Sequence, residues 1–117
     1  MLRCFLRSKI HRAVVTHTDL HYEGSLGIDA KLMELADLSY GEKVDIYNIS
    51  NGNRFSTYVV PADHGSGHIR VLGAAAHKVE KGDLLIIASY VFLNDNERLS
   101  FKPKVISVDH SNQPKSN

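Results

Sequence analysis

The sequence predicts a mainly β protein, folded as a small closed or nearly closed barrel. Three observations support this prediction: many short runs of strand-forming residues, one strong hairpin signal, and little helical patterning. The hairpin signal is Asn51-Gly52, which lies between the strand-like runs 44–50 and 54–60. Closing such strands into a barrel also removes exposed sheet edges.

The other elements follow from the spacing of apolar and β-branched residues. Strands are expected at 13–16, 44–50, 54–60, 68–72, 83–93 and 103–108. Across 29–38 the apolar residues recur at three- and four-residue spacing, which predicts one short amphipathic helix. Asp29 is a suitable N-cap for this helix and Gly41 a suitable stop. The run 73–79 permits one extra helical turn.

Composition limits the classes of function. The chain has 117 residues, so we expect one domain over 1–117. With 14 basic and 13 acidic residues, the formal net charge of +1 provides no footprint for nucleic acid or an anionic membrane. No apolar run reaches membrane-spanning length, and the charged N-terminus does not fit a signal peptide. We expect a cytoplasmic protein that acts on a small molecule.

Cysteine usage and the C-terminal segment add two expectations. The single cysteine, Cys4, excludes an internal disulfide and fits a reducing compartment. The segment 109–117 is polar and contains Pro114, so we expect it to form a flexible tail.

Histidines raise the question of a metal site, because the chain has 7 of them. His17 and His21 are four residues apart, as in a helical zinc pair. However, their β-branched and glycine neighbours argue against a helix, and the pattern offers no third ligand. We therefore expect these histidines to face solvent or lie in turns, with no metal bound.

The pair Gly24-Ser25 lies between Tyr22 and the apolar residues Leu26 and Ile28, close to packed structure. Composition alone predicts a tight turn at this point. A second such pair, Gly65-Ser66, has polar neighbours and is expected to be an exposed loop.

The run 54–60 places several chemically useful side chains on one strand. Arg54, Ser56 and Tyr58 are expected to share one face of this strand, and Phe55 and Thr57 the other. Arginine can hold a carboxylate with two hydrogen bonds, tyrosine can transfer a proton, and threonine can orient a carbonyl. Taken alone, however, the pattern also fits a half-buried strand with a polar outer face.

The small residues at 73–76 are open to two interpretations. They let a ligand approach backbone N–H groups, as carboxylate and phosphate sites require, and they also suit tight packing. No glycine-rich nucleotide motif accompanies them.

Taken together, five segments resemble aspartate 1-decarboxylases. They are 9–12 (KIHR), 17–25 (HTDLHYEGS), 51–60 (NGNRFSTYVV), 73–77 (GAAAH) and 82–90 (GDLLIIASY), in this order. Each motif is weak by itself, but their common order and spacing are specific. Residues beyond about 95 do not contribute to the resemblance.

The resemblance implies a double-psi β-barrel that assembles as a homotetramer with active sites at subunit boundaries. It also implies self-cleavage between Gly24 and Ser25 into 1–24 and 25–117, with Ser25 converted to a pyruvoyl group. Thr57 matches the residue that stabilises the oxyanion during cleavage. This pyruvoyl group replaces pyridoxal phosphate (PLP), and no metal is implied. Some members of the family need a helper protein for maturation.

The same resemblance implies a reaction and its binding residues. L-Aspartate forms a Schiff base with the pyruvoyl group, loses carbon dioxide and leaves as β-alanine, a precursor of pantothenate. Tyr58 matches the proton donor, and Arg54 is the best candidate to hold a substrate carboxylate. Lys9 and His11 match further polar residues of the site. The backbone of Gly73, Ala74 and Ala75 matches the substrate-binding segment. The resemblance also places Thr57 among the substrate-binding residues.

One position departs from the family pattern. Leu72 stands directly before Gly73, where the family usually has asparagine, and leucine cannot make the hydrogen bonds of that amide. Two alternatives to an active decarboxylase are a barrel that binds an anion through Arg54 and the 73–75 backbone without chemistry, and an inactive relative.

Overall fold

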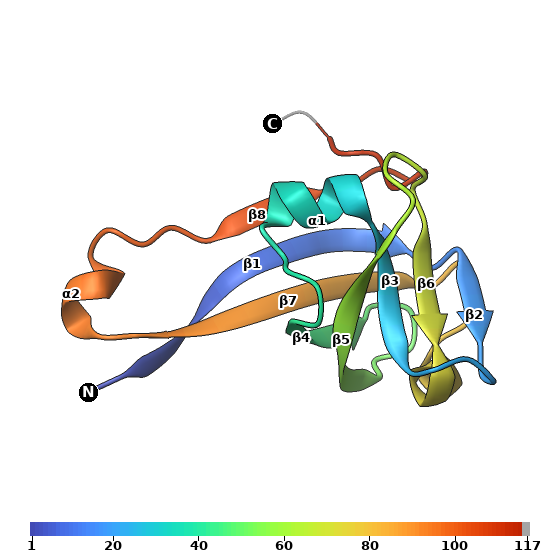
Figure 1. Cartoon of the computed structure of the whole chain (residues 1–117), viewed down its shortest axis with the longest axis horizontal. Coiled ribbons are helices and arrows are strands. Elements are labelled where there is room, and N and C mark those ends of the chain that lie inside the picture. The colour runs from blue at the N-terminus through green and yellow to red at the C-terminus, as the bar shows by residue number, and fades with distance from the viewer. Residues whose placement is uncertain (116–117) are drawn as a thin grey trace.

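The computed structural model describes residues 1–115, whose strands form one 8-stranded sheet in the order β2-β6-β3-β5-β4-β7-β1-β8 (Figure 1). The strands are β1 (Arg3–Val14), β2 (His17–Asp19), β3 (Ser25–Asp29), β4 (Lys43–Asn48), β5 (Arg54–Ala62), β6 (Ile69–Leu72), β7 (Leu84–Leu93) and β8 (Lys104–Ser107). The helices are α1 (Ala30–Ala36), the 3₁₀ helix η1 (Gly73–Lys78) and α2 (Asp95–Arg98). The prediction of a mainly β fold is confirmed.

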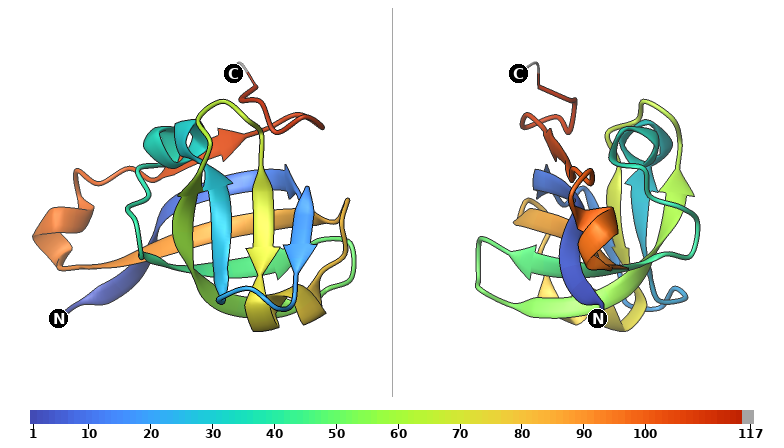
Figure 2. Two further views of the ribbon diagram at one scale, coloured as in Figure 1. Left: turned by 45° about the vertical axis from the view of Figure 1, so that its right-hand side comes forward. Right: turned by 90° about the vertical axis from the view of Figure 1, so that its left-hand side faces the viewer.

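The sheet curves on itself, so that β2, β6, β3 and β5 face β4, β7 and β1 across the interior (Figure 2). Alternate side chains of these strands point inward and form the core. The largest fully buried aliphatic side chains are Ile10, Leu26, Ile28, Leu32, Ile46, Ile69, Leu85 and Ile87. Each such burial stabilises the fold by about 1.5–3 kcal/mol. Helix α1 lies over one end of the sheet and adds Leu32, Met33 and Ala36 to the core.

Strands β1 and β7 form a long antiparallel ribbon that extends past the barrel toward α2 (Figure 1). Their register runs from Arg3 opposite Leu93 to Val14 opposite Leu84, with irregularities at Arg7 and Arg12. Arg12 has a left-handed backbone, with φ of 69°. These two bulges shift the inward and outward alternation of β1. The pattern therefore predicted a strand at 13–16, of which only Ala13 and Val14 belong to β1.

The predicted helix at 29–38 is present but shorter. The Asp29 side chain accepts a hydrogen bond from the Lys31 N–H at 2.9 Å, which confirms the N-cap. The helix ends at Ala36 because Asp37 adopts a left-handed conformation with φ of 55°, so Gly41 is not its stop. The extra turn at 73–79 is η1. Helix α2 was not predicted, and it begins with a capping box between Asn94 and Glu97.

The C-terminal segment packs against the barrel as far as Lys115, contrary to the flexible tail expected over 109–117. Asn112 is buried, accepts a hydrogen bond from the Val14 N–H at 2.7 Å and donates to the carbonyls of Val14 and Gly67, both at 2.8 Å. A polar side chain thus completes the end of β1. Residues 116–117 lie outside the described part of the chain. Within residues 1–115, no helix has the length and apolarity to cross a membrane.

The Asn112 contacts lead to a prediction about stability. Asn112→Ala should lower the free energy of unfolding by about 2–4 kcal/mol, because it leaves the buried backbone groups of Val14 and Gly67 without partners. Urea denaturation measures this difference. The control Asn96→Ala, at an exposed position of the short helix α2, should change stability by about 0.5 kcal/mol or less. Equal losses in the two variants would contradict the account.

Candidate active site

Ser25 is the first residue of β3 and lies at the boundary between an exposed turn and the buried sheet. It pairs with Leu72 of β6 and is 5% exposed, whereas Gly24 before it is exposed. The tight turn expected at this point ends at Gly24, and Ser25 already belongs to the strand. The Gly24–Ser25 peptide bond therefore has a fixed strand on one side and an open turn on the other.

The backbone of Gly73 packs directly on the backbone of Gly24. Gly73 has φ of 73°, and a Cβ atom there would lie 2.5 Å from Gly24 Cα, 2.7 Å from Gly24 N and 2.9 Å from Tyr22 O. Only glycine is suited to this position, because other residues rarely adopt this φ and their Cβ atom would clash with the backbone of Gly24. Two segments far apart in the sequence thus meet through their main chains.

A pocket of about 410 Å³ lies beside this contact. Its lining residues come from the turn before β3, from β5 and from η1: Gly24, Phe55, Ser56, Thr57, Tyr58, Ala74, Ala75 and Lys78. The volume is within the usual range for small-molecule sites. Five residues expected in the site therefore line one cavity: Gly24, Thr57, Tyr58, Ala74 and Ala75. Ser25 and Gly73 do not line it.

Strand β5 supplies the candidate catalytic side chains of this pocket. Its alternation agrees with the prediction, since Arg54, Ser56 and Tyr58 are exposed while Phe55 and Thr57 are half-buried. Tyr58 is 43% exposed and lines the pocket.

Arg54 lies in a neighbouring hollow of about 260 Å³ instead of the Gly24 pocket. The two hollows share Phe55 and Ser56 as walls. The Arg54 guanidinium lies over the ring of Tyr47, with its central carbon 4.5 Å from the ring centroid. The structure thus places Arg54 at the border of the pocket.

Lys9 and His11 do not reach the Gly24 pocket within one chain. His11 is opposite Ile86, Ile86 opposite Tyr47, and Tyr47 opposite Arg54, so all four residues share one side of the sheet. Strands β7 and β4 separate β1 from β5, a distance of about 14 Å at the usual strand spacing. Lys9 occupies the next outward position of β1, opposite Ala88.

The environment of His11 disfavours its protonated form. Burial lowers the pKa of His11 below the ordinary 6.5, and the nearby cations Lys9, Arg12 and Lys115 lower that pKa further. Its Nδ1 atom is buried with no hydrogen-bond partner in the described part of the chain. These effects favour the neutral form of the His11 side chain.

Comparison with known proteins identifies the family. The family model described as aspartate decarboxylase matches residues 1–115. The chain is 57% identical over 115 residues to the aspartate 1-decarboxylase of Syntrophus aciditrophicus, covering 98% of this chain and 99% of that protein. It is 54% identical over 116 residues to the aspartate 1-decarboxylase of Methylibium petroleiphilum, covering 99% and 97% of the two chains. The chain belongs to the aspartate decarboxylase family. This confirms the resemblance seen in the sequence.

Leu72, which departs from the usual pattern of the aspartate decarboxylase family, is 3% exposed at the end of β6. It precedes η1 without any side-chain hydrogen bond to the helix end. The position next to Gly73 is therefore occupied by a buried apolar group.

Lys78 is a pocket residue that the sequence analysis missed. Its backbone carbonyl accepts hydrogen bonds from the side-chain amides of Asn48, Asn51 and Asn53, at 3.3, 3.1 and 3.1 Å. These amides fix the end of η1 to the turn between β4 and β5. The hairpin signal predicted that turn but not its hydrogen bonds to the end of η1.

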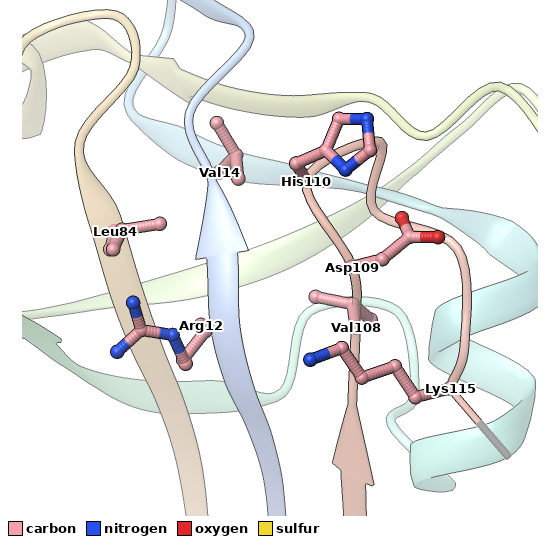
Figure 3. Close-up of a pocket in the computed structure, with 7 residues that line it drawn as sticks. All are labelled: Arg12, Val14, Leu84, Val108, Asp109, His110 and Lys115. Atoms are coloured by element: carbon pink, nitrogen blue, oxygen red, sulfur yellow. The ribbon is translucent and has the colours of Figure 1, made fainter.

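A second pocket, shown in Figure 3, lies between the end of β1, β7 and the C-terminal segment. It has a volume of about 260 Å³ and shares no residue with the Gly24 pocket. It is lined by Arg12, Val14, Leu84, Val108, Asp109, His110 and Lys115. Among residues 1–115, no three His, Cys, Asp or Glu side chains gather as metal ligands would.

The environment of His11 yields a testable pKa. In a pH titration followed by nuclear magnetic resonance, the His11 pKa should lie below 6.5. Lys9→Met should raise this pKa only part of the way, because burial is the larger cause. Lys81→Met is the control and should leave it unchanged, since Lys81 is not among the groups that act on His11. A His11 pKa at or above 6.5 in the parent protein would be inconsistent with this environment.

Proposed function

We propose that the protein decarboxylates L-aspartate to β-alanine and carbon dioxide, supplying pantothenate synthesis in the cytoplasm. Before this it cleaves itself between Gly24 and Ser25, and Ser25 becomes a pyruvoyl group. The observation that carries the proposal is the contact of Gly73 with Gly24, which joins the cleavage bond to a pocket walled by Thr57 and Tyr58. The match to the family supports the same reaction.

In the cleavage, the Ser25 hydroxyl attacks the carbonyl carbon of Gly24, and the amide becomes an ester as the C–N bond breaks. Elimination then releases the Gly24 carboxylate, and water converts residue 25 to the ketone with loss of ammonia. The pairing of Ser25 with Leu72 holds the backbone of Ser25 in place next to the bond that breaks. Thr57 is the donor proposed to stabilise the oxyanion.

A small ketone group at position 25 would lie beside the pocket, because Gly24 lines it. Ala74 and Ala75 leave space in the pocket, and their backbone N–H groups are suited to hold a substrate. The pyruvoyl ketone, once formed, supplies the sink for the electrons left by departing carbon dioxide. Tyr58 then delivers a proton to the α-carbon, and its exposure is compatible with this role. Neither PLP nor a metal takes part.

Arg54, at the border of the pocket, is proposed to hold a substrate carboxylate by paired hydrogen bonds. Lys9 and His11 then act on the pocket of a neighbouring copy in a homotetramer. Their face of the sheet also exposes Tyr90, by 40%, and Phe92, by 67%, which suits burial against a second copy. If neighbouring copies share the walls of each pocket, a chain of this length can enclose its substrate.

The proposed cleavage is tested by intact-mass spectrometry of the purified protein. We expect two pieces, 1–24 and 25–117, with a pyruvoyl terminus on the second. Ser25→Ala should remain whole and release no carbon dioxide from L-aspartate. The assay is repeated with host extract, which supplies any maturation helper. If the parent protein stays uncleaved and inactive both with and without host extract, the proposed function is wrong. The protein is then an anion-binding barrel or an inactive relative.

The contact between Gly73 and Gly24 predicts a second effect on cleavage. Gly73→Ala should slow self-cleavage on the order of 100-fold, because its Cβ must push Gly24 out of place. Gly41→Ala is a matched control: Gly41 has φ of 80° but nothing within 4 Å of a Cβ there. It carries the same backbone penalty without the clash. Equal cleavage rates for the two variants, measured by mass spectrometry, would exclude a role for the contact.

Sharing of the site between chains predicts complementation. Lys9→Ala and Ser25→Ala should each be nearly inactive alone, yet co-expressed chains should regain activity. In mixed assemblies, an intact Lys9 from one chain meets the pyruvoyl group of the other. As a control, co-expression of Lys9→Ala with His11→Ala should restore nothing, because every chain then has a defective outer face. If co-expressed Lys9→Ala and Ser25→Ala chains are no more active than either variant alone, the site is not shared between chains.

A further inference from the structure

Within the described residues, the Arg54 guanidinium has no carboxylate partner and is available to a ligand. Among residues 1–115, no carboxylate oxygen lies within 4.0 Å of its guanidinium nitrogens. The nearest candidate in the same hollow is Asp45, whose Oδ1 accepts a hydrogen bond from the Ser56 hydroxyl at 2.6 Å. Ser56 thus engages the carboxylate that would otherwise compete for Arg54.

The orientation of Arg54 depends on Tyr47. The two residues are directly opposite each other on β5 and β4, and the guanidinium carbon is 4.5 Å from the ring centroid. The negative face of an aromatic ring attracts a cation at this distance. The planar guanidinium therefore has a preferred position over Tyr47, while its N–H groups stay free for an anion.

Tyr47 is in turn held by Tyr90. Their hydroxyl oxygens are 2.7 Å apart and share a hydrogen bond, which links β4 to β7 on the same side of the sheet. The hydrogen bond with Tyr47 and burial raise the pKa of Tyr90 to about 12, so Tyr90 keeps its proton at neutral pH. Tyr90 therefore remains a hydrogen-bonding partner for Tyr47 at neutral pH.

We propose that Tyr47 and Tyr90 are positioning residues that hold the Arg54 guanidinium ready to bind the substrate carboxylate. This proposal rests on the proposed function of Arg54. The contacts run from β7 through β4 to β5 without touching the Gly24 pocket, since neither tyrosine lines it. The pair therefore acts on substrate binding, and cleavage at Gly24–Ser25 and proton transfer by Tyr58 do not depend on it.

The test combines kinetics with the binding of succinate, which has the two carboxylates of aspartate without its amine. Tyr47→Leu should raise KM for L-aspartate and Kd for succinate by about tenfold, at kcat within about twofold of the parent. Tyr47→Phe keeps the ring and Tyr90→Phe keeps the neighbouring bulk, so each should raise both constants by about threefold. Tyr40→Phe, at a tyrosine that is 76% exposed, is the matched control and should change neither.

The double variant Tyr47→Phe/Tyr90→Phe gives the sharpest result. Both changes remove the same hydrogen bond. The double variant should therefore have the same KM for L-aspartate and the same Kd for succinate as either single variant. Additive losses, or an unchanged succinate Kd in Tyr47→Leu, would overturn the positioning role.

The succinate measurement also separates this proposal from the proposed reaction. If the parent protein releases no carbon dioxide from aspartate while Tyr47→Leu still weakens succinate binding, the reaction fails and the positioning pair stands. If the parent is active and Tyr47→Leu matches it in KM and Kd, only the positioning pair fails.

Discussion

The backbone contact between Gly24 and Gly73 is the constraint on which the rest of the site depends. It places the turn before β3 against the start of η1, at a distance that excludes any Cβ atom. Because Ser25 is also paired with Leu72, the two segments are joined by strand register on one side and by van der Waals contact on the other. The Gly24–Ser25 bond consequently has little freedom to move relative to the pocket.

A second set of interactions fixes the other end of η1. The amides of Asn48, Asn51 and Asn53 converge on the carbonyl of Lys78, and Asn48 also donates to the Asp83 carboxylate at 2.8 Å. The tip of the β4–β5 hairpin thus anchors the end of η1, while Gly73 anchors its beginning. Strand β5, which carries Thr57 and Tyr58, leaves the same hairpin. The Gly24–Ser25 bond, η1 and β5 are thereby fixed to one another.

Local features of the site could be predicted from the sequence because each is decided by neighbouring residues. The hairpin at Asn51-Gly52, the Asp29 cap and the alternation along β5 are of this kind. The beginning of β1 could not be predicted, because two bulges interrupt its alternation. Nor could the packing of Asn112, whose partners Val14 and Gly67 are distant in sequence.

The same distinction applies to the functional residues. Gly24, Thr57, Tyr58, Ala74 and Ala75 were predicted from the family resemblance, and the structure gathers them in one pocket. Lys78 and the Tyr47–Tyr90 pair were missed, because their positions follow from the register between strands and from the path of η1. Arg54, Lys9 and His11 share one outer face of the sheet, which only the pairing of β1, β7, β4 and β5 reveals.

The most direct test of the central claim is reductive trapping of the substrate on residue 25. The protein is incubated with L-aspartate and cyanoborohydride, digested, and sequenced by tandem mass spectrometry. The account predicts a substrate-derived amine fixed covalently to residue 25 at the start of the fragment 25–117, and none in Ser25→Ala. A parent protein that carries no substrate-derived adduct at residue 25 would contradict the account.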